Sequence, residues 1–269
     1  MSPPESAGSV DSADLPESLT AEVANGVLRL TITRAHKRNA IDSPTLLGLE
    51  RVFTTLDASV RCVILHGDGP HFCAGLDLNE VSDRDTIGGL HFSRMWHRVF
   101  QTIEFGAVPV VSVLRGATIG AGLELASATH VRIAESTTFY ALPEGQRGIF
   151  VGGGGSVRIP RLIGTSRMME MMLTGHRYNA DEGLALGLSH YVVDDGAGMA
   201  LAEQLAAQIA SNEPFTNFAI VNALPRIAEA EPATGYLLEA AIGGAAQSTD
   251  SAKARVQEFL TRKPKPSSG

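Results

Sequence analysis

Two glutamates in glycine-bearing turns are the residues of this sequence best suited to do chemistry. Glu124 follows the turn Gly120-Ala-Gly122 at the start of a predicted helix, and Glu144 follows a proline after a strand-like run. Two such carboxylates can hold a water between them while free backbone N–H groups bind a carbonyl oxygen. A site of this kind adds or removes water next to a polarised carbonyl.

Each glutamate also has an ordinary interpretation as a charge on a helix or turn surface, where most lone glutamates lie. The neighbours of Glu124 argue against it, because Leu123, Leu125 and Ala126 are apolar. A carboxylate in apolar surroundings needs a partner or a chemical task. The sequence therefore favours a functional carboxylate at position 124.

Composition limits the class of protein. The chain has 269 residues, 44% hydrophobic and 19% charged, which suits one sizeable domain or a domain with an appendage. Its net charge of -7 argues against a nucleic-acid partner but allows a local basic patch for a small phosphorylated ligand. Cys62 and Cys73 form neither a CxxC motif nor a zinc-like spacing. We expect a reducing compartment, no metal and no redox cofactor.

The N-terminal segment and the apolar runs bear on location. No run approaches the roughly 20 apolar residues of a membrane helix, so we expect no membrane partner. The first residues are acidic and lack the apolar core of a signal peptide. We interpret residues 1–17 as a disordered acidic tail and the protein as cytoplasmic.

The pattern of apolar residues predicts an α/β architecture followed by helices. Asn25-Gly26 between two strand-like runs, 20–24 and 27–33, is a strong hairpin signal. Strands and helices then alternate to about residue 195. The further expected elements are helices after Ser43 and over 90–105 and 120–128, and strands over 60–66, 108–114, 131–134 and 137–142.

The character of the chain changes near residue 199. The segments 199–211, 214–230 and 233–261 are helical and rich in alanine. We place the core at 18–198 and a helical oligomerisation region at 199–269. The apolar stretches 215–224 and 236–242 carry little charge, so either a neighbouring subunit covers them or the helices fold back on their own core.

The glycine clusters invite a test for nucleotide binding. Gly152-Gly-Gly-Gly155-Ser156 lacks the Gly-Lys that a P-loop places before its serine. In the turn before Glu124, Leu125 occupies the place of the third glycine of a dinucleotide fingerprint. Both assignments fail. Close backbone packing and N–H groups exposed at helix starts explain these glycines better.

Several motifs in a fixed order resemble the enoyl-CoA hydratase/isomerase (crotonase) superfamily over roughly residues 20–262. The matching segments are 36–41 (HKRNAI), 72–77 (FCAGLD), 115–124 (RGATIGAGLE), 142–144 (LPE), 152–164 and 173–175 (LTG). The resemblance implies a spiral of ββα turns with a C-terminal helical trimerisation region. It also implies an acyl-CoA substrate, no separate cofactor, and a homotrimer or a dimer of trimers.

The resemblance also assigns roles to residues. The N–H groups of Leu76 and Ala121 would polarise the thioester carbonyl, Glu124 would act as base on water, and Glu144 would supply a proton to the α-carbon. The separation of the glutamates, 144 − 124 = 20, matches the hydratases of the family, and Gly152 would support the site through its amide. The positions implied for CoA contacts are Lys37, Arg38, Ala40, Ala74, Leu76 and Asp77.

The sequence departs from the family pattern at three places. Ala121 replaces a usual glycine, which keeps the N–H but narrows the floor of the site. Val151 replaces a frequent proline before Gly152, and His130 stands where Asp is common. We expect a structural role for His130. Nothing pairs Cys73 with a base, so we interpret it as a small buried residue and not as a nucleophile.

The resulting hypothesis is reversible syn addition of water across the 2,3 double bond of an enoyl-CoA. The alternatives are an enoyl-CoA isomerase or a hydratase-lyase, which use the same enolate, and a CoA-binding protein without turnover. The two intact carboxylates argue against the last. The sequence does not identify the acyl group. Aromatic residues at helical spacing, such as Phe92, Trp96 and Phe100, more often belong to a hydrophobic core than to a substrate pocket.

Overall fold

The computed structural model describes residues 15–80 and 84–261. These residues divide into two compact units, and the boundary along the chain lies between Ala210 and Ser211. The elements of the first unit are β1 (Leu19–Ala24), β2 (Val27–Ile32), α1 (Ser43–Thr54), β3 (Cys62–Gly67), α2 (Thr86–Glu104), β4 (Val110–Leu114), β5 (Ala117–Ile119), α3 (Ala121–Ser127), β6 (Val131–Glu135), β7 (Phe139–Ala141), α4 (Gly155–Ile163), α5 (Thr165–Thr174), β8 (Tyr178–Asn179), α6 (Ala180–Leu186), β9 (Tyr191–Val193) and α7 (Gly198–Ala210). The elements of the second are α8 (Pro214–Asn222), α9 (Leu224–Glu229), α10 (Pro232–Ser248) and α11 (Asp250–Thr261). The prediction of an α/β architecture with a helical C-terminal region is confirmed.

The larger sheet has six strands in the order β1-β2-β3-β4-β6-β9. Only the β1–β2 pair is antiparallel, and the turn that joins these strands holds Asn25 and Gly26 at φ 52° and 74°. Two positive φ values in a two-residue loop are typical of the type I′ turn that Asn-Gly favours. The predicted hairpin is confirmed.

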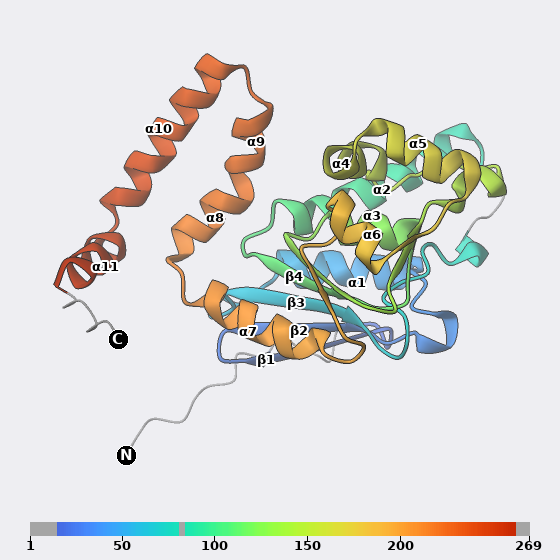
Figure 1. Ribbon diagram of the computed structural model, residues 1–269, viewed down its shortest axis with the longest axis horizontal. Helices are drawn as coiled ribbons and strands as arrows, with labels where there is room; N and C mark the ends of the chain where they lie inside the picture. Colours follow the sequence, from blue (N-terminus) through green and yellow to red (C-terminus); the bar gives the residue numbers. More distant parts are fainter. Residues whose placement is uncertain (1–14, 81–83, 262–269) are drawn as a thin grey trace, which may run out of the picture. The chain divides into compact units, whose positions relative to one another are not determined.

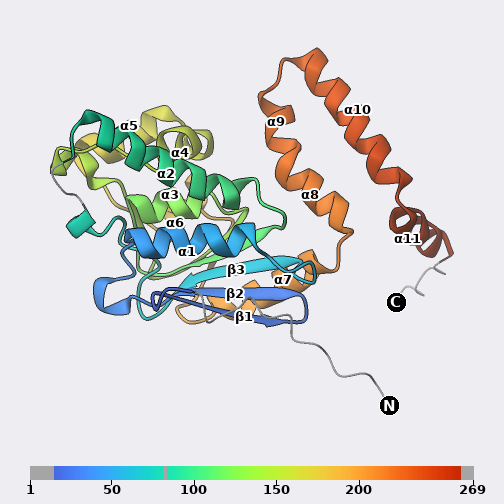
Figure 2. The same ribbon diagram turned by 180° about the vertical axis from the view of Figure 1, so that it is seen from behind.

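The two faces of this sheet are covered by different helices (Figures 1 and 2). Along β3, Val63 and Leu65 join the main core with residues of α1 and α2, whereas Cys62 and Ile64 pack against α7. This alternation follows from the two-residue period of a strand, and it explains why β3 is apolar on both sides.

Helix α7 therefore belongs to the first unit. Its Ala202 and Ala206 are fully buried against the sheet, where alanine lets a helix approach closely. The expected boundary at 198/199 differs from the observed one at 210/211 for this reason. Alanine-rich composition alone does not distinguish a helix packed on a sheet from one in a helical appendage.

A second, three-stranded sheet, β5-β7-β8, brings the two glutamates together. Strands β5 and β7 are parallel, Ile119 is the register partner of Ala141, and the Gly120 N–H donates to the Ala141 carbonyl over 2.9 Å. The carboxyl ends of both strands therefore lie side by side. Glu124 follows the first end on α3, and Glu144 follows the second on a short 3₁₀ helix, Pro143–Arg147.

Most of the expected acidic tail, residues 1–14, lies outside the described residues. Within the rest of it, Leu15 packs against the main core and the Pro16 carbonyl accepts a 2.9 Å hydrogen bond from the Leu19 N–H. Residues 15 and 16, which were expected to belong to the tail, thus contact the core unit. Among the described helices, none combines the length and the apolar character that crossing a membrane requires.

Candidate active site

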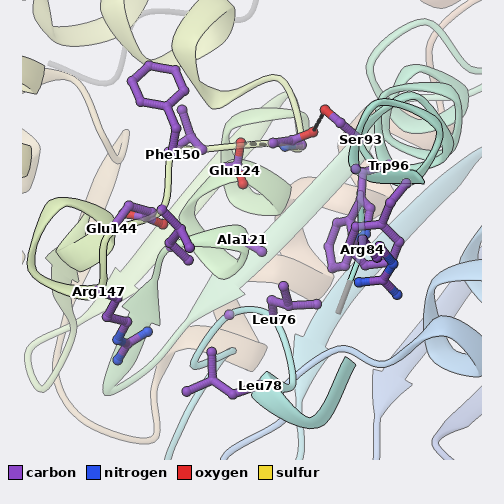
Figure 3. Close-up of a pocket in the computed structure, with 18 of the residues that line it drawn as sticks. Leu76, Leu78, Arg84, Ser93, Trp96, Ala121, Glu124, Glu144, Arg147 and Phe150 are labelled. Atoms are coloured by element: carbon purple, nitrogen blue, oxygen red, sulfur yellow. Dashed lines mark hydrogen bonds between the residues drawn. The ribbon is translucent and has the colours of Figure 1, made fainter. Parts of the chain in front are cut away.

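The two glutamates share one cavity of about 420 Å³ in the first unit. Its wall is formed by the segment 74–78, the start of α3, the inner face of α2 and the segment 144–153. Figure 3 shows Ser93 and Trp96 of α2 on one side, Glu144 and Phe150 on the other, and Glu124 between them. The predicted site residues Ala74, Leu76, Ala121, Glu124, Glu144 and Gly152 all line this cavity.

Glu124 is held in place by backbone amides. Its side chain is buried, and its Oε1 accepts 2.8 Å hydrogen bonds from the N–H groups of Gly153 and Gly155. Helix α4 begins at Gly155, so the carboxylate lies at the positive end of a helix. Burial raises the pKa of Glu124, whereas the two amides and the guanidinium of Arg158 oppose the rise.

Glu144 lies in a different environment. It is 7% exposed, and its Oε2 is buried without a hydrogen-bond partner among the residues described. Burial and the charge of Glu124 raise the pKa of Glu144 to about 7. A carboxyl group with such a pKa is substantially protonated at neutral pH and can act as a general acid.

The approach of Glu144 requires a glycine at position 120. Gly120 has φ of 54°, and a Cβ atom there would lie 2.7 Å from Glu144 Oε1. Both the positive φ and the close contact exclude a larger residue. The glycine that the sequence places in this turn thus makes room for the second glutamate.

The N–H groups of Leu76 and Ala121, which were expected to bind a carbonyl oxygen, lie in the wall of the cavity. Ile41 is bonded to both neighbours of Leu76, donating to the Gly75 carbonyl and accepting from the Asp77 N–H over 2.8 Å each. In a parallel bridge this leaves the Leu76 N–H on the opposite side of the segment. Ala121 is the first residue of α3, so its N–H has no partner within the helix.

These two amides belong to segments that lie in contact. A Cβ atom on Gly75 would lie 3.4 Å from the Ala121 backbone nitrogen and 2.9 Å from the Ile119 carbonyl oxygen. Gly75 itself has φ of 103°, which side chains rarely allow. The two amides therefore belong to adjoining segments that line the same cavity as the two carboxyl groups.

The inner face of α2 supplies an aromatic wall. Phe92 and Trp96 line the cavity with ring centroids 6.0 Å apart, and Phe100 is completely buried behind Trp96. The guanidinium carbon of Arg84 lies 3.9 Å from the centroid of the Phe92 ring. Of the aromatic residues considered as core or pocket, Phe92 and Trp96 touch the cavity and Phe100 belongs to the core.

The residues expected to contact CoA divide into two groups. Ala74 and Leu76 line the cavity, whereas Lys37, Arg38, Ala40 and Asp77 are not among its lining residues. Lys37 Nζ donates to Asp77 Oδ2 over 2.8 Å, and this bond, together with one from Arg34, lowers the pKa of Asp77 to about 2. A 2.9 Å bond from the Ala74 N–H to the Arg38 carbonyl joins the two loops.

His130 and Cys73 have structural surroundings. His130 Nδ1 accepts from the Val110 N–H over 2.9 Å and its Nε2 lies 3.2 Å from the Glu104 carbonyl, while burial lowers its pKa to about 4. Burial raises the pKa of the Cys73 thiol to about 12, which disfavours the thiolate. Within the described ranges, no three His, Cys, Asp or Glu side chains gather as a metal site would need.

Three features of the site escaped the sequence analysis. Ser93 lines the cavity and its Oγ donates to the Gly152 carbonyl over 2.6 Å (Figure 3). The amides that reach Glu124 belong to Gly153 and Gly155, and Gly152 contributes its carbonyl to Ser93. Arg158 packs beneath this loop. The run of four glycines indicated exposed amides, but nothing in the sequence identified their partner.

Known proteins resemble this chain over nearly its whole length. Residues 22–267 match the model of the family described as enoyl-CoA hydratase/isomerase. A short-chain-enoyl-CoA hydratase of Clostridium acetobutylicum is 32% identical over 237 residues, which cover 87% of this chain and 91% of the relative. An enoyl-CoA isomerase/hydratase of Mycosarcoma maydis is 32% identical over 225 residues, covering 80% and 82%.

A solved structure agrees with these relatives. The protein from Rhodopseudomonas palustris CGA009, provisionally named an enoyl-CoA hydratase, has 49% identity and a TM-score of 0.88, and the match covers 90% of this chain and 94% of the other. The fold is therefore the one that the resemblance implied. By its sequence and its fold, the chain belongs to the enoyl-CoA hydratase/isomerase family.

Proposed function

We propose that the protein is an enoyl-CoA hydratase that adds water reversibly and syn across the 2,3 double bond of an enoyl-CoA thioester. The family acts on acyl-CoA substrates, and relatives named as hydratases match most of the chain. The observation that carries the proposal is the contrast between two carboxyl groups on one cavity. The carboxylate of Glu124 accepts hydrogen bonds from two backbone N–H groups, whereas one carboxyl oxygen of Glu144 has no hydrogen-bond partner among the described residues.

This contrast supports different roles for the two glutamates. Hydrogen bonds to a carboxylate favour its ionised form, which suits Glu124 as the base that takes a proton from water. The water oxygen then bonds to C3 of the substrate. The raised pKa of Glu144 suits it as the acid that gives its proton to C2. One water is consumed, and a proton must return from Glu124 to Glu144 before the next turnover.

The electrons of the double bond need a place to go while the new C–O bond forms. In the proposed mechanism they move toward the thioester oxygen, which gains enolate character. The N–H groups of Leu76 and Ala121 would donate to that oxygen, and Ala121 adds the positive end of α3. Removing one donor from such an arrangement typically costs about 10²–10³-fold in kcat.

The CoA portion of the substrate would extend outside the cavity, onto two neighbouring loops. The loop at 37–40 is tied to the segment at 74–77 through Arg38 and Ala74 and through Lys37 and Asp77. We place the CoA contacts on this pair of loops, at Lys37, Arg38, Ala40, Ala74, Leu76 and Asp77. The protein would assemble as a homotrimer or as a dimer of trimers.

Crotonyl-CoA tests the reaction. Incubation in ¹⁸O-labelled water should remove the enoyl-thioester absorbance and yield a 3-hydroxyacyl-CoA that carries the label. In deuterated water one deuteron should appear at C2. An isomerase would move the double bond of a 3-enoyl-CoA without gaining the mass of a water, and a non-catalytic binding protein would change neither substrate. Either result would overturn the proposal.

A further inference from the structure

Arg158 of α4 lies beneath the loop that holds Glu124. Its side chain is 7% exposed and makes four hydrogen bonds. Nη2 donates to the Gly153 carbonyl over 2.5 Å and to the Glu124 carbonyl over 3.2 Å, so that one nitrogen joins the loop to α3. Nε donates to Ser127 Oγ over 3.1 Å, and Nη1 lies 3.3 Å from Glu104 Oε2.

The contacts of Arg158 bear on the amides that bind the carboxylate. Gly153 gives its N–H to Glu124 Oε1 and its carbonyl to Arg158. The two peptide units that flank the Gly153 Cα are therefore each held by a hydrogen bond, which limits how far the Gly153 N–H can turn away from Glu124. The packing is close, because a Cβ atom on Gly155 would lie 2.8 Å from Glu124 Oε1.

We propose that Arg158 is a positioning residue that keeps the carboxylate of Glu124 aligned and ionised by anchoring the Gly153–Gly155 loop and placing a buried positive charge beneath it. The inference deepens the proposed function, on which its kinetic consequences rest. Arg158 touches no substrate in this arrangement, because it is absent from the cavity lining. Its effect on Glu124 is a property of the folded protein and is measurable without turnover.

Several charged or titratable groups face Glu124, and Arg158 is the cation whose charge opposes its protonation most strongly. Burial raises the pKa of Glu124, while the amides of Gly155 and Gly153, then Arg158 and then His97 of α2, lower it. Glu144 interacts with it across the cavity. Arg158 is itself partly neutralised by Glu104 on α2. Arginine stays protonated in proteins, so its charge is present at every working pH.

The first test follows the ionisation of Glu124 directly. In protein labelled with ¹³C at the glutamate carboxyl carbons, the Glu124 resonance is the one that disappears in Glu124→Gln. Arg158→Gln removes the charge but keeps hydrogen-bonding atoms, and the pKa of Glu124 should rise by about one unit or more, as for the loss of a neighbouring opposite charge. Arg158→Lys keeps the charge and should show a clearly smaller rise.

The second test is kinetic. Loss of the loop anchor misplaces the base, and a misplacement of about 1 Å can cost about 10²-fold. Arg158→Lys should therefore lower kcat by about tenfold or more, with KM nearly unchanged. In Arg158→Gln the acidic limb of kcat/KM against pH should move to higher pH, because Glu124 must lose its proton to act as base.

Arg132 provides a matched control. It is also a buried arginine, 4% exposed, and its guanidinium donates to the carbonyls of Leu188 and Thr129, over 2.7 and 2.8 Å. Arg132→Gln and Arg132→Lys should lower the melting temperature without changing the Glu124 titration. This separates a general loss of stability from the effect assigned to Arg158.

The outcomes distinguish the two proposals. An unchanged Glu124 titration in Arg158→Gln, or an equal change in the Arg132 variants, would overturn the role of Arg158. If Arg158→Gln does not fold, an Arg158→Lys protein with the kcat of the wild type would overturn it instead. If the titration shifts while the wild-type protein hydrates no enoyl-CoA, the proposed function fails and the role of Arg158 stands.

Discussion

Ser93 Oγ donates a 2.6 Å hydrogen bond to the carbonyl of Gly152. The bond joins α2 to the residue that precedes the Gly153–Gly155 loop, whose amides bind Glu124. His97, one turn further along α2, places its Nε2 3.3 Å from the same hydroxyl. The aromatic wall and the loop that carries the amides therefore do not move independently.

Ser93→Ala should lower both stability and turnover by modest amounts. Loss of one partly buried hydrogen bond costs about 1 kcal/mol, which urea unfolding would measure. Because the loop would gain freedom, kcat for crotonyl-CoA should fall while the affinity for CoA changes little. Thr102→Ala on the same helix is the control, since the Thr102 hydroxyl donates to the Val99 carbonyl within α2. Equal kcat values for both variants would contradict the role of Ser93.

Glu144→Gln should leave the fold and CoA binding nearly intact while reducing turnover severely. A general acid typically contributes about 10²–10⁴-fold, and the amide is close in shape but cannot give up a proton as readily. Initial rates with crotonyl-CoA and calorimetric binding of CoA would measure the two properties. Hydration within a few-fold of the wild-type rate would show that the assignment of Glu144 is wrong.

Glu124→Gln and the double variant form a second comparison. Because both glutamates would act in the same addition of water, removing the second after the first should cost little more. The double variant should therefore have a kcat close to that of the slower single variant. Multiplicative losses, measured under identical conditions, would indicate that the two groups act in separate steps.

The raised pKa of Glu144 also predicts a dependence of stability on pH. Its pKa is about 7 in the folded protein against an ordinary value of 4.5, so between these values the folded state holds a proton that the unfolded chain has lost. Stability from protonated Glu144 is complete below about 4.5 and is lost as the pH rises through about 7. The loss amounts to about 3 kcal/mol.

Glu144→Gln removes this titration. The melting temperature of the variant relative to the wild type should therefore increase as the pH rises from about 4.5 to about 7 and level off above that range. Glu22→Gln, on the exposed face of β1, is the control for a general effect of charge removal. A difference in melting temperature that stays constant with pH would contradict the assigned pKa of Glu144.

The exposed apolar side chains of the second unit indicate that the protein self-associates. Among its side chains, Phe218 and Ile220 of α8 are 45% and 52% exposed, and Tyr236 and Leu237 of α10 are 73% and 71% exposed. Exposed apolar side chains in such number favour cover by another chain. Light scattering at micromolar concentration should give three or six times the chain mass of 28.4 kDa. Leu237→Glu should lower that mass, and a wild-type mass near 28.4 kDa would exclude the assembly.

Sequence patterns predicted those parts of the fold that depend on local chemistry. Asn25-Gly26 required positive φ values, and the hairpin follows from them. The motifs around Glu124 and Glu144 similarly located the cavity. The shared site itself depends on the pairing of β5 with β7, two three-residue strands whose register no local pattern specifies.

Other features depend on tertiary contacts that single-sequence reasoning does not reach. Helix α7 has the alanine-rich composition of the C-terminal helices, yet it packs on the sheet. Arg158 stands in an ordinary amphipathic helix, and only the fold brings it under Gly153. Lys37 and Asp77 were expected at a ligand, and their pairing with each other emerges only when their loops meet.

The N-terminus of α4 has no capping side chain of its own, since its N-cap residue is Gly154. Glu124, distant in the sequence, supplies the missing acceptor to Gly155. Replacing Glu124 would therefore remove the proposed base and uncap a helix at once, whereas replacing Glu144 would remove the proposed acid and a buried oxygen that has no hydrogen-bond partner among the described residues. Loss of the carboxylate should accordingly cost more stability at position 124 than at position 144.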